Sequence, residues 1–180
     1  TKEIAALTEQ GYKVFLLCNN KSGWPRQEEV DGATVLRLRH WGARWTPVLN
    51  IPLFFNPLWL RGIRRAIREH EIGVIHVHDL PLALSAIRAG RRFRIPVVFD
   101  VHENYPEAMR IWGHKGMFWF ILRNPWLSEK LERYCLRAAD AVITVSEEHR
   151  ELFLRQGLPP AKVHFVGNTV DYESYLEMTI

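Results

Sequence analysis

Two histidine-rich segments carry the side chains best suited to chemistry in this sequence. In the first, HVHDL, His76 and His78 alternate along an apolar run and Asp79 follows directly. A histidine titrates near neutral pH and can donate, accept or shuttle a proton, and a neighbouring carboxylate can fix its tautomer. The segment therefore indicates a proton-handling or ligand-binding site. A plainer interpretation also stays open, in which His76 is a hydrogen-bonded core histidine and Asp79 only caps a following helix.

The second segment, FDVHENYPE, covers residues 99–107. Its apolar start leads straight into a dense group of polar side chains, which is unusual at the end of a strand. His102 is the strongest functional candidate, with Glu103 and Asn104 beside it. Under the plainer interpretation, Asp100 only bonds a neighbouring backbone group and the rest of the segment forms a turn.

No metal site is expected from these residues. His76, His78 and His102 could gather in the fold, but HVHDL lacks the third-ligand spacing of a recognised zinc site. The two cysteines, Cys18 and Cys135, have neither CxxC spacing nor clustered histidines around them. They are therefore expected to be buried, reduced thiols.

A weaker signal is the segment VGNTVD, residues 166–171. Gly167 permits a close backbone approach, and Asn168 tolerates unusual dihedral angles. By itself the segment is more typical of an ordinary turn after a strand.

The elements that position these segments follow from the apolar pattern. Four short runs are rich in β-branched residues, which suits strands buried on both faces of a parallel sheet. These runs cover residues 74–77, 97–101, 142–145 and 163–166. Residues 13–18 and 34–39 predict two more strands, and the alternation in the second places it nearer an edge of the sheet.

Helix boundaries are marked by side-chain chemistry. Asn56 and Asn124 each precede a proline, which is typical of a helix start, and Ser146 precedes two glutamates at a third start. Three glycines follow helical patterns and are expected to end them in a left-handed conformation: Gly11, Gly90 and Gly157.

Strands that alternate with helices predict a Rossmann-like α/β fold, an open parallel sheet with helices on both faces. Residues 1–180 are expected to form a single domain of this kind, with ligands outside the carboxyl ends of the strands. The chain begins in a helical pattern, residues 1–10, that leads into a strand. Because a crossover helix needs a strand before it, we expect the first strand of the fold to be missing.

The composition is that of a soluble globular domain. The 180 residues include 24 Lys and Arg against 20 Asp and Glu, a formal net charge of +4, and 47% are hydrophobic. These values exclude a disordered chain, and only two cysteines exclude a disulfide scaffold and favour a cytosolic compartment. No signal peptide is expected. The longest uncharged stretch, residues 45–60, is too short for a membrane span and contains three prolines.

A basic amphipathic helix is predicted after Pro57. Its arginines fall at positions i, i+3, i+4 and i+7: Arg61, Arg64, Arg65 and Arg68. Aromatic residues cluster nearby at 41–59 and again at 111–126, and such a mixture suits an anionic membrane surface. Equally, the arginines could be a solvated face and the tryptophans a core or domain contact. Nucleic acid is not an expected partner, because no recognition helix, RNP-like strand or zinc spacing accompanies the arginines.

Four segments occur in order along the chain: HVHDL, FDVHENYPE, ADAVITVSEEH and VGNTVD. In that order and at those separations, the sequence resembles the amino-terminal domain of GT-B glycosyltransferases of family 4. The resemblance covers nearly the whole chain. It implies two Rossmann-like domains that face a cleft. The first would bind the acceptor and the second the nucleotide-sugar donor, with retention of the anomeric configuration.

The resemblance also implies roles for individual residues. His102 resembles the cleft histidine of the family, which contacts the donor sugar and helps to form the catalytic centre. The positions that resemble substrate-binding residues are His78, Asp79, Glu103, Asn104, Ser146 and Asn168. Ser146 begins a helix whose N–H groups would point to the cleft, and Asn168 lies in the segment that leads toward the second domain.

The expected function is therefore the acceptor-binding half of a retaining glycosyltransferase. The enzyme would move a sugar from a nucleotide-sugar donor to a glycan, lipid-linked or small-molecule acceptor, with the donor as a substrate and no metal or other cofactor. Because the carboxyl-terminal donor domain is absent from these residues, the chain alone is expected to be inactive. The expected location is the cytoplasm, either free or peripheral on the inner face of the membrane.

Two other functions stay open. The chain could be a non-catalytic accessory module that pairs with a separate donor-binding subunit. A nicotinamide-dependent oxidoreductase would share the parallel sheet, but no GxGxxG motif occurs in the sequence.

Overall fold

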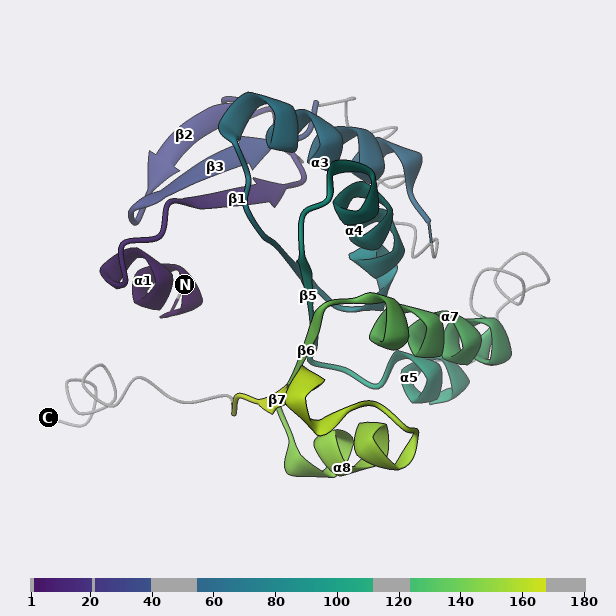
Figure 1. The fold of residues 1–180 in the computed structure, drawn as a ribbon. Helices are drawn as coiled ribbons and strands as arrows, with labels where there is room; N and C mark the ends of the chain where they lie inside the picture. The colour runs from purple at the N-terminus through teal and green to yellow at the C-terminus, as the bar shows by residue number, and fades with distance from the viewer. Residues whose placement is uncertain (1, 21, 40–54, 112–123, 168–180) are drawn as a thin grey trace, which may run out of the picture.

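The chain folds into two neighbouring sheets with helices packed against them (Figure 1). This computed structural model describes residues 2–20, 22–39, 55–111 and 124–167. Asn168 and most of the two aromatic segments, 41–59 and 111–126, lie outside the described residues. The predicted α/β class is confirmed.

The four predicted apolar runs form a parallel sheet. Its strands stand in the order β4 (Ile75–His78), β5 (Val97–Val101), β6 (Ala141–Thr144) and β7 (Val163–Phe165), and each neighbouring pair is parallel. Their carboxyl ends therefore lie at one edge of the sheet, as the sequence predicted. Side chains along a strand alternate between the two faces, so Phe99 and Asp100 of β5 point to opposite sides.

A second sheet of three strands precedes the parallel one in the chain. Its order is β1 (Val14–Cys18), β3 (Ala33–Arg37) and β2 (Gln27–Val30), with β3 parallel to β1 and antiparallel to β2. The prediction that the strand at residues 34–39 lies near an edge is wrong. β3 is the central strand of this sheet, and its residues 33–36 are buried.

β2 is a strand that the sequence analysis did not predict. Its residues, QEEV, have no apolar pattern. Polar contacts stabilise its pairing with β3, since Glu28 forms an ion pair with Arg37. Asp31 and Gly32 form the turn between the two strands, and both have positive φ, at 51° and 79°. An Asp-Gly pair is a strong hairpin signal and could have revealed this strand.

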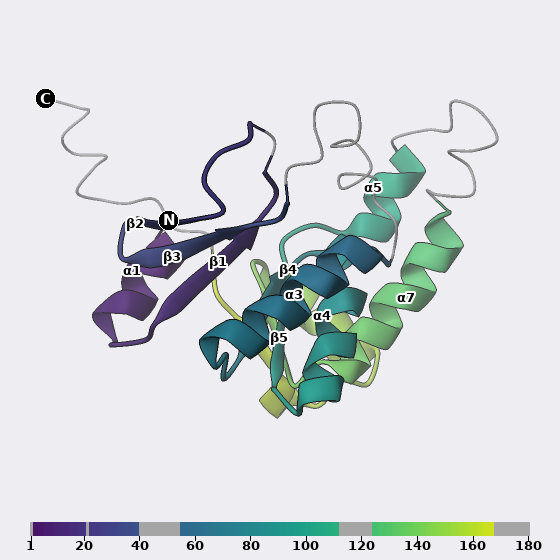
Figure 2. The same ribbon diagram turned by 90° about the horizontal axis from the view of Figure 1, so that it is seen from above.

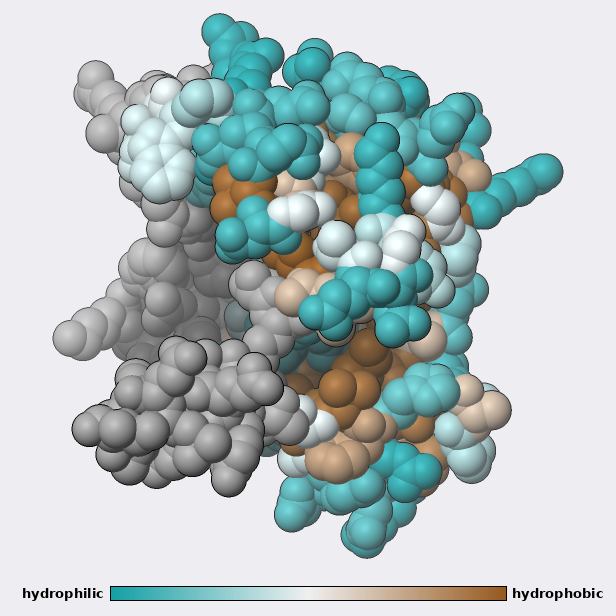
Figure 3. All heavy atoms as spheres, turned by 90° about the vertical axis from the view of Figure 1, so that its left-hand side faces the viewer, coloured by the Kyte–Doolittle hydropathy of each residue, from teal (hydrophilic) through white to brown (hydrophobic). Residues whose placement is uncertain are grey.

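β1 and β4 each have one edge beside which no described strand lies. The described residues do not test the expectation of a further strand before the helix at residues 1–10, and it stays a prediction. The side of the molecule on which α1 (Lys2–Glu9) lies shows apolar surface between hydrophilic regions (Figure 3). Leu7 and Leu16 are among the exposed apolar residues, at 38% and 41% exposure.

Helices cover both sides of the strands, as predicted. α3 (Pro57–His70), α4 (Leu80–Phe93) and α7 (Pro125–Ala138) lie together on one side, and α1 lies on the other (Figures 1 and 2). α5 (Tyr105–Ile111) follows β5, α8 (Glu147–Arg155) packs against β7, and the short 3-10 helix η1 (Pro160–Lys162) precedes β7. In the described residues, no helix is both long enough and apolar enough to cross a membrane.

The three predicted helix starts are confirmed. The side chains of Asn56, Asn124 and Ser146 each accept a hydrogen bond from a backbone N–H in the first turn of α3, α7 and α8. Gly11 follows α1 and Gly157 follows α8, and their φ angles of 82° and 87° are the left-handed conformation expected there.

The prediction for Gly90 is wrong. This glycine lies inside α4, which continues to Phe93 and ends at Arg94 with a left-handed φ of 57°. A Cβ at Gly90 would come within 2.4 Å of Val97 Cγ2 and 2.7 Å of the Ile95 carbonyl oxygen. The missing side chain therefore allows α4 to pack closely against the start of β5.

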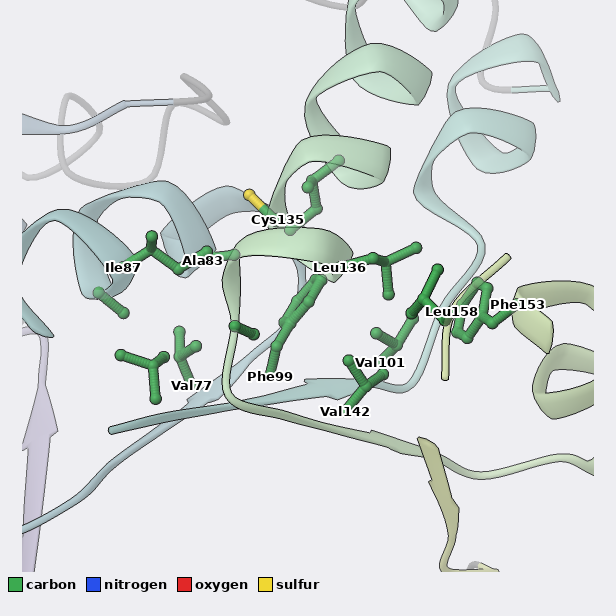
Figure 4. Packing of buried hydrophobic residues seen from close by; sticks show 14 of the residues in the cluster. Val77, Ala83, Ile87, Phe99, Val101, Cys135, Leu136, Val142, Phe153 and Leu158 are labelled. Carbon is green, nitrogen blue, oxygen red and sulfur yellow. The ribbon is translucent and has the colours of Figure 1, made fainter. Parts of the chain in front are cut away.

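The main hydrophobic core lies between the parallel sheet and helices α4 and α7 (Figure 4). Phe99, Leu136 and Val142 have no exposed surface there. Close packing of Phe99 in this core holds β5 in position. The Asp100 side chain, on the opposite face of the same strand, is therefore held in position as well.

Candidate active site

The carboxyl ends of β4 and β5 bring three histidines around one aspartate. The strand register places His78 beside Asp100, and His102 follows the last residue of β5. His76 lies two residues before His78 on the same face of β4, and the two rings stack with their centroids 4.6 Å apart. We call His76, His78, Asp100 and His102 the histidine cluster.

Asp100 is the centre of the histidine cluster. Its Oδ2 atom lies 3.0 Å from His76 Nε2, 3.0 Å from His102 Nε2 and 3.3 Å from His78 Nδ1. Burial of this side chain, only 4% exposed, acts to raise its pKa, but hydrogen bonds to His76 and His102 outweigh burial. The pKa of Asp100 is therefore held below its ordinary value, and the side chain is a buried anion at neutral pH.

His78 connects the cluster to the first helix. Its Nε2 atom lies 3.4 Å from Glu3 Oε2, while its Nδ1 atom lies 3.3 Å from His102 Nε2. The His78 side chain is 49% exposed and that of His102 is 28% exposed. A ligand can therefore reach both rings without displacing the core.

Asp79 ties the end of β4 to β5. Its backbone N–H donates to the Asp100 carbonyl oxygen at 2.8 Å, and its Oδ1 accepts a hydrogen bond of 3.2 Å from the His102 N–H. The alternative that its side chain only caps α4 is wrong, because Asp79 makes no side-chain bond to that helix. Its φ of 60° and ψ of 164° are strained for any residue but glycine.

Sequence comparison identifies the family of this chain. The sequence profile of the glycosyl transferase 4-like domain matches residues 2–169. The chain belongs to this family. The resemblance drawn from the four sequence segments is therefore confirmed, and the chain is a glycosyltransferase domain with a GT-B type fold. No curated protein sequence matches it.

Two solved structures of sucrose-phosphate synthase from Thermosynechococcus elongatus resemble this glycosyl transferase 4-like domain. One gives a TM-score of 0.65 at 16% identity, over 99% of this chain and 89% of that chain. The other gives a TM-score of 0.61 at 15% identity, over 99% of this chain but only 46% of that chain. The domain thus spans less than half of the second structure. At these identities the likeness shows the fold alone.

Glu103 and Asn104 of the glycosyl transferase 4-like domain are exposed, and neither bonds to the histidine cluster in the described residues. Asn104 Oδ1 instead accepts a hydrogen bond of 3.1 Å from the Glu107 N–H, so this side chain caps α5.

Burial, and then the nearby carboxylates of Asp79 and Glu103, raise the pKa of Tyr105 to about 12. The Tyr105 phenol therefore stays protonated at neutral pH.

Ser146 acts as the cap that the sequence predicted. Its Oγ accepts a hydrogen bond of 3.2 Å from the His149 N–H, and Glu147 and Glu148 occupy the first turn of α8. Among the described residues it has no hydrogen bond to the histidine cluster. Asn168, the last of the predicted site residues, lies outside the described residues. The structure thus brings together His78, Asp79 and His102 from the predicted set.

Two members of the site were not selected from the sequence as functional residues. Asp100 had a visible signal, because a single carboxylate inside an otherwise apolar strand must find partners when it is buried. Glu3 had no such signal, because the sequence of a short amphipathic helix does not distinguish a functional glutamate from a solvent-exposed one. His76 is hydrogen-bonded, as the plainer interpretation required, but its side chain is 28% exposed and does not lie in the core.

A second concave surface lies between α3 and the β2–β3 pair. This cavity of about 390 Å³, which we call the basic groove, has five arginines in its lining: Arg26, Arg37, Arg39, Arg61 and Arg65. Two of them are paired with acids, Arg37 with Glu28 and Arg65 with Glu69 at 2.8 Å. Two of the four predicted arginines of α3, Arg61 and Arg65, thus border a cavity whose basic lining suits an anionic group.

Proposed function

We propose that this domain is the acceptor-binding half of a retaining glycosyltransferase. In this proposal a sugar passes from a nucleotide-sugar donor to a glycan, lipid-linked or small-molecule acceptor at the carboxyl ends of the parallel strands. The observation that carries the proposal is the His102 ring. It is partly exposed, stands at the end of β5 and is anchored 3.0 Å from the buried Asp100 carboxylate. Membership of the family supports it.

His102 is the proposed catalytic residue. Contact of the ring with the donor sugar would place a hydrogen-bonding group beside the bond that breaks, where the departing diphosphate gains charge. Because Asp100 and the Asp79 contact already fix this histidine, little rotamer freedom is lost when substrate binds. His78 and Asp79 form the adjacent acceptor side in this proposal.

Four further residues are proposed to bind substrate: Glu103, Asn104, Ser146 and Asn168. The exposed Glu103 and the segment that contains Asn168 would face the cleft. Ser146 would act through the helix that it caps, by presenting backbone N–H groups of α8, and Asn104 would contribute the amide nitrogen of its exposed side chain.

A donor-binding domain completes the cleft in this proposal, so the 180-residue chain alone is expected to be inactive. The first test is the intact mass of the native protein in its source cells, detected with an antibody against this segment. A mass about twice 21.1 kDa supports a two-domain enzyme. A mass near 21.1 kDa contradicts it and favours an accessory module with a separate donor-binding subunit.

The second test is sugar transfer by the full-length protein, assayed with a panel of nucleotide sugars. We expect His102→Ala to lower kcat by at least about 100-fold. His164→Ala is the matched control, because His164 lies exposed on β7, and it should keep the wild-type rate. Unchanged transfer by His102→Ala would remove His102 from the catalytic centre, and robust transfer by the isolated chain would contradict its expected inactivity.

Transfer is proposed to need neither a metal nor another cofactor, because positive charge from the donor domain and the hydrogen bonds at His102 would stabilise the leaving diphosphate. Treatment of the full-length protein with a chelator should therefore leave the rate of transfer undiminished. A rate that falls with chelation and returns with added magnesium contradicts this part of the proposal.

We also propose that the domain works in the cytoplasm and docks on anionic membrane through α3. Arg61, Arg65 and Arg68 are exposed on that helix, and both cysteines are unpaired thiols. Sedimentation with anionic vesicles should be lost in 0.5 M salt (about a 4 Å screening length) and in Arg61→Glu. Arg155→Glu, on the exposed end of α8, is the control. Binding that ignores lipid charge and salt contradicts electrostatic docking.

A further inference from the structure

Three atoms of the histidine cluster have the spacing of ligands around one metal ion. His78 Nδ1 lies 3.3 Å from both His102 Nε2 and Asp100 Oδ2, and the latter two atoms are 3.0 Å apart. Ligand atoms bound to zinc at about 2.0–2.2 Å stand about 2.8–3.1 Å from one another in octahedral geometry and about 3.3–3.6 Å in tetrahedral geometry. We infer that His78, Asp100 and His102 bind a divalent transition-metal ion, with zinc as the best match.

The surrounding residues support these three ligands. Glu3 Oε2 lies 3.4 Å from Nε2 of His78, the ring nitrogen that faces away from the proposed metal. His76 Nε2 lies 3.0 Å from the ligating oxygen of Asp100. Metal-bound histidines commonly donate their second N–H to a carboxylate, which fixes the ring and its tautomer. Glu3 is therefore a positioning residue for His78.

The lone pairs of the cluster converge on one point. Three ring nitrogens approach Asp100 Oδ2, and His78 Nδ1 and His102 Nε2 face each other at 3.3 Å. Without a metal, one proton between the two rings and the hydrogen bonds from His76 and His102 to Oδ2 satisfy these atoms. A cation at this point would replace that proton and accept one lone pair from each ring and one from the carboxylate.

The charge and the ligand types favour a transition metal over magnesium or calcium. One ligand atom from each of His78, Asp100 and His102, together with one from Glu3, lies within 4.8 Å of the others. Two imidazoles with one carboxylate suit zinc, whereas magnesium and calcium prefer oxygen ligands. The partial exposure of both rings leaves room for water or a ligand at the remaining coordination position.

Metal binding has a consequence that rests on the proposed function. A metal ion held by His102 would occupy the ring that is proposed to contact the donor sugar, so zinc would inhibit transfer. The metal site itself does not depend on that function, because it follows from distances within this chain.

The test uses the 180-residue chain after removal of metals with a chelator. Cobalt(II) is titrated while the ligand-field absorption is recorded, and zinc affinity is then obtained by competition. We expect one ion per chain. His78→Ala and His102→Ala should each weaken zinc binding by about 100-fold or more, and Glu3→Gln by about 10-fold. His164→Ala, which removes an exposed histidine elsewhere, should bind zinc as the wild type does.

Circular dichroism and urea unfolding show whether each variant is folded, so that a loss of metal binding is not a loss of structure. The inference is overturned if the chain shows no ligand-field band at one equivalent of cobalt. It is equally overturned if folded His78→Ala and His102→Ala both keep wild-type zinc affinity. Neither result bears on sugar transfer, and absence of transfer by the full-length protein would leave the metal result unchanged.

Discussion

Oδ1 of Asp79 and the backbone N–H of His102 are joined by a hydrogen bond of 3.2 Å, which links the loops that follow β4 and β5. Asp79 also donates its own N–H to the carbonyl oxygen of Asp100 at 2.8 Å. Two bonds from one residue therefore set the path of the chain into His102. The φ of 60° at Asp79 is the conformational cost of this arrangement.

Two substitutions at Asp79 distinguish the contribution of its side-chain hydrogen bond to stability from the cost of its strained backbone. Asp79→Ala removes the side-chain bond but keeps the unfavourable φ, so the free energy of unfolding should fall by about 1–2 kcal/mol. Asp79→Gly removes the same bond and relieves the strain, so it should be more stable than Asp79→Ala by about 1 kcal/mol. Urea unfolding measures both. A glycine variant less stable than the alanine variant would show that the backbone here is not strained.

The buried charge of Asp100 leads to a second prediction. Asp100→Asn keeps the size of the side chain but replaces the shared carboxylate with a neutral amide, so the bonds to His76 and His102 weaken. The free energy of unfolding of the chelator-treated chain should fall by about 1–3 kcal/mol. Asp31→Asn, at an exposed turn where asparagine tolerates the positive φ, is the control and should stay near wild type.

Much of the site follows from the sequence because it depends on strand ends. The apolar runs around His76 and Phe99 predict adjacent parallel strands, and the carboxyl ends of such strands meet. The selection of Asp100 as the centre did not follow, because which side chains face one another depends on the register between β4 and β5. β4 and β5 are joined through helix α4 and not by a tight turn, so no turn motif in the sequence fixes their register.

The errors elsewhere in the fold have similar causes. Gly90 looks like a helix end in the sequence, but its role is close contact with Val97, a residue on another element. β2 escaped prediction because a polar strand can be stabilised by its partner, as Glu28 is by Arg37. In each case a contact between elements outweighs the preference of the local segment.

Close packing at Gly90 gives a third prediction. In Gly90→Ala the new Cβ would meet Val97 Cγ2 at 2.4 Å and the Ile95 carbonyl oxygen at 2.7 Å, so α4 must shift from β5. We expect the free energy of unfolding to fall by about 1–3 kcal/mol despite the better helix propensity of alanine. Gly73→Ala is the matched control, because a Cβ there meets nothing within 4 Å, and it should be nearly neutral.

A fourth prediction concerns Glu132 of α7. Burial, and then the nearby Glu129 carboxylate, raise the pKa of Glu132 from 4.5 to about 7. The folded state therefore favours the protonated acid. The resulting stability is fully present below pH 4.5 and is lost as the pH rises to about 7.

The measurement is urea unfolding between pH 4 and pH 8. Glu132→Gln should flatten the decline between about pH 5 and 7 and should be more stable than wild type at pH 8 by about 1–2 kcal/mol. Glu9→Gln, at an exposed position of α1, should leave the slope unchanged. If the free energy of unfolding of Glu132→Gln falls with pH as steeply as that of the wild type, other groups cause the pH dependence.

The pairing of His78 with Asp100 in adjacent strands restricts how this domain can be redesigned or can diversify. Insertion or deletion of one residue within β4 or β5 would turn the following side chains to the opposite face and dismantle the site. Glu103, just after His102, is exposed, so substitutions there leave the strand register unchanged. The domain can therefore vary at exposed positions after β5, while the two strands must keep their length and register.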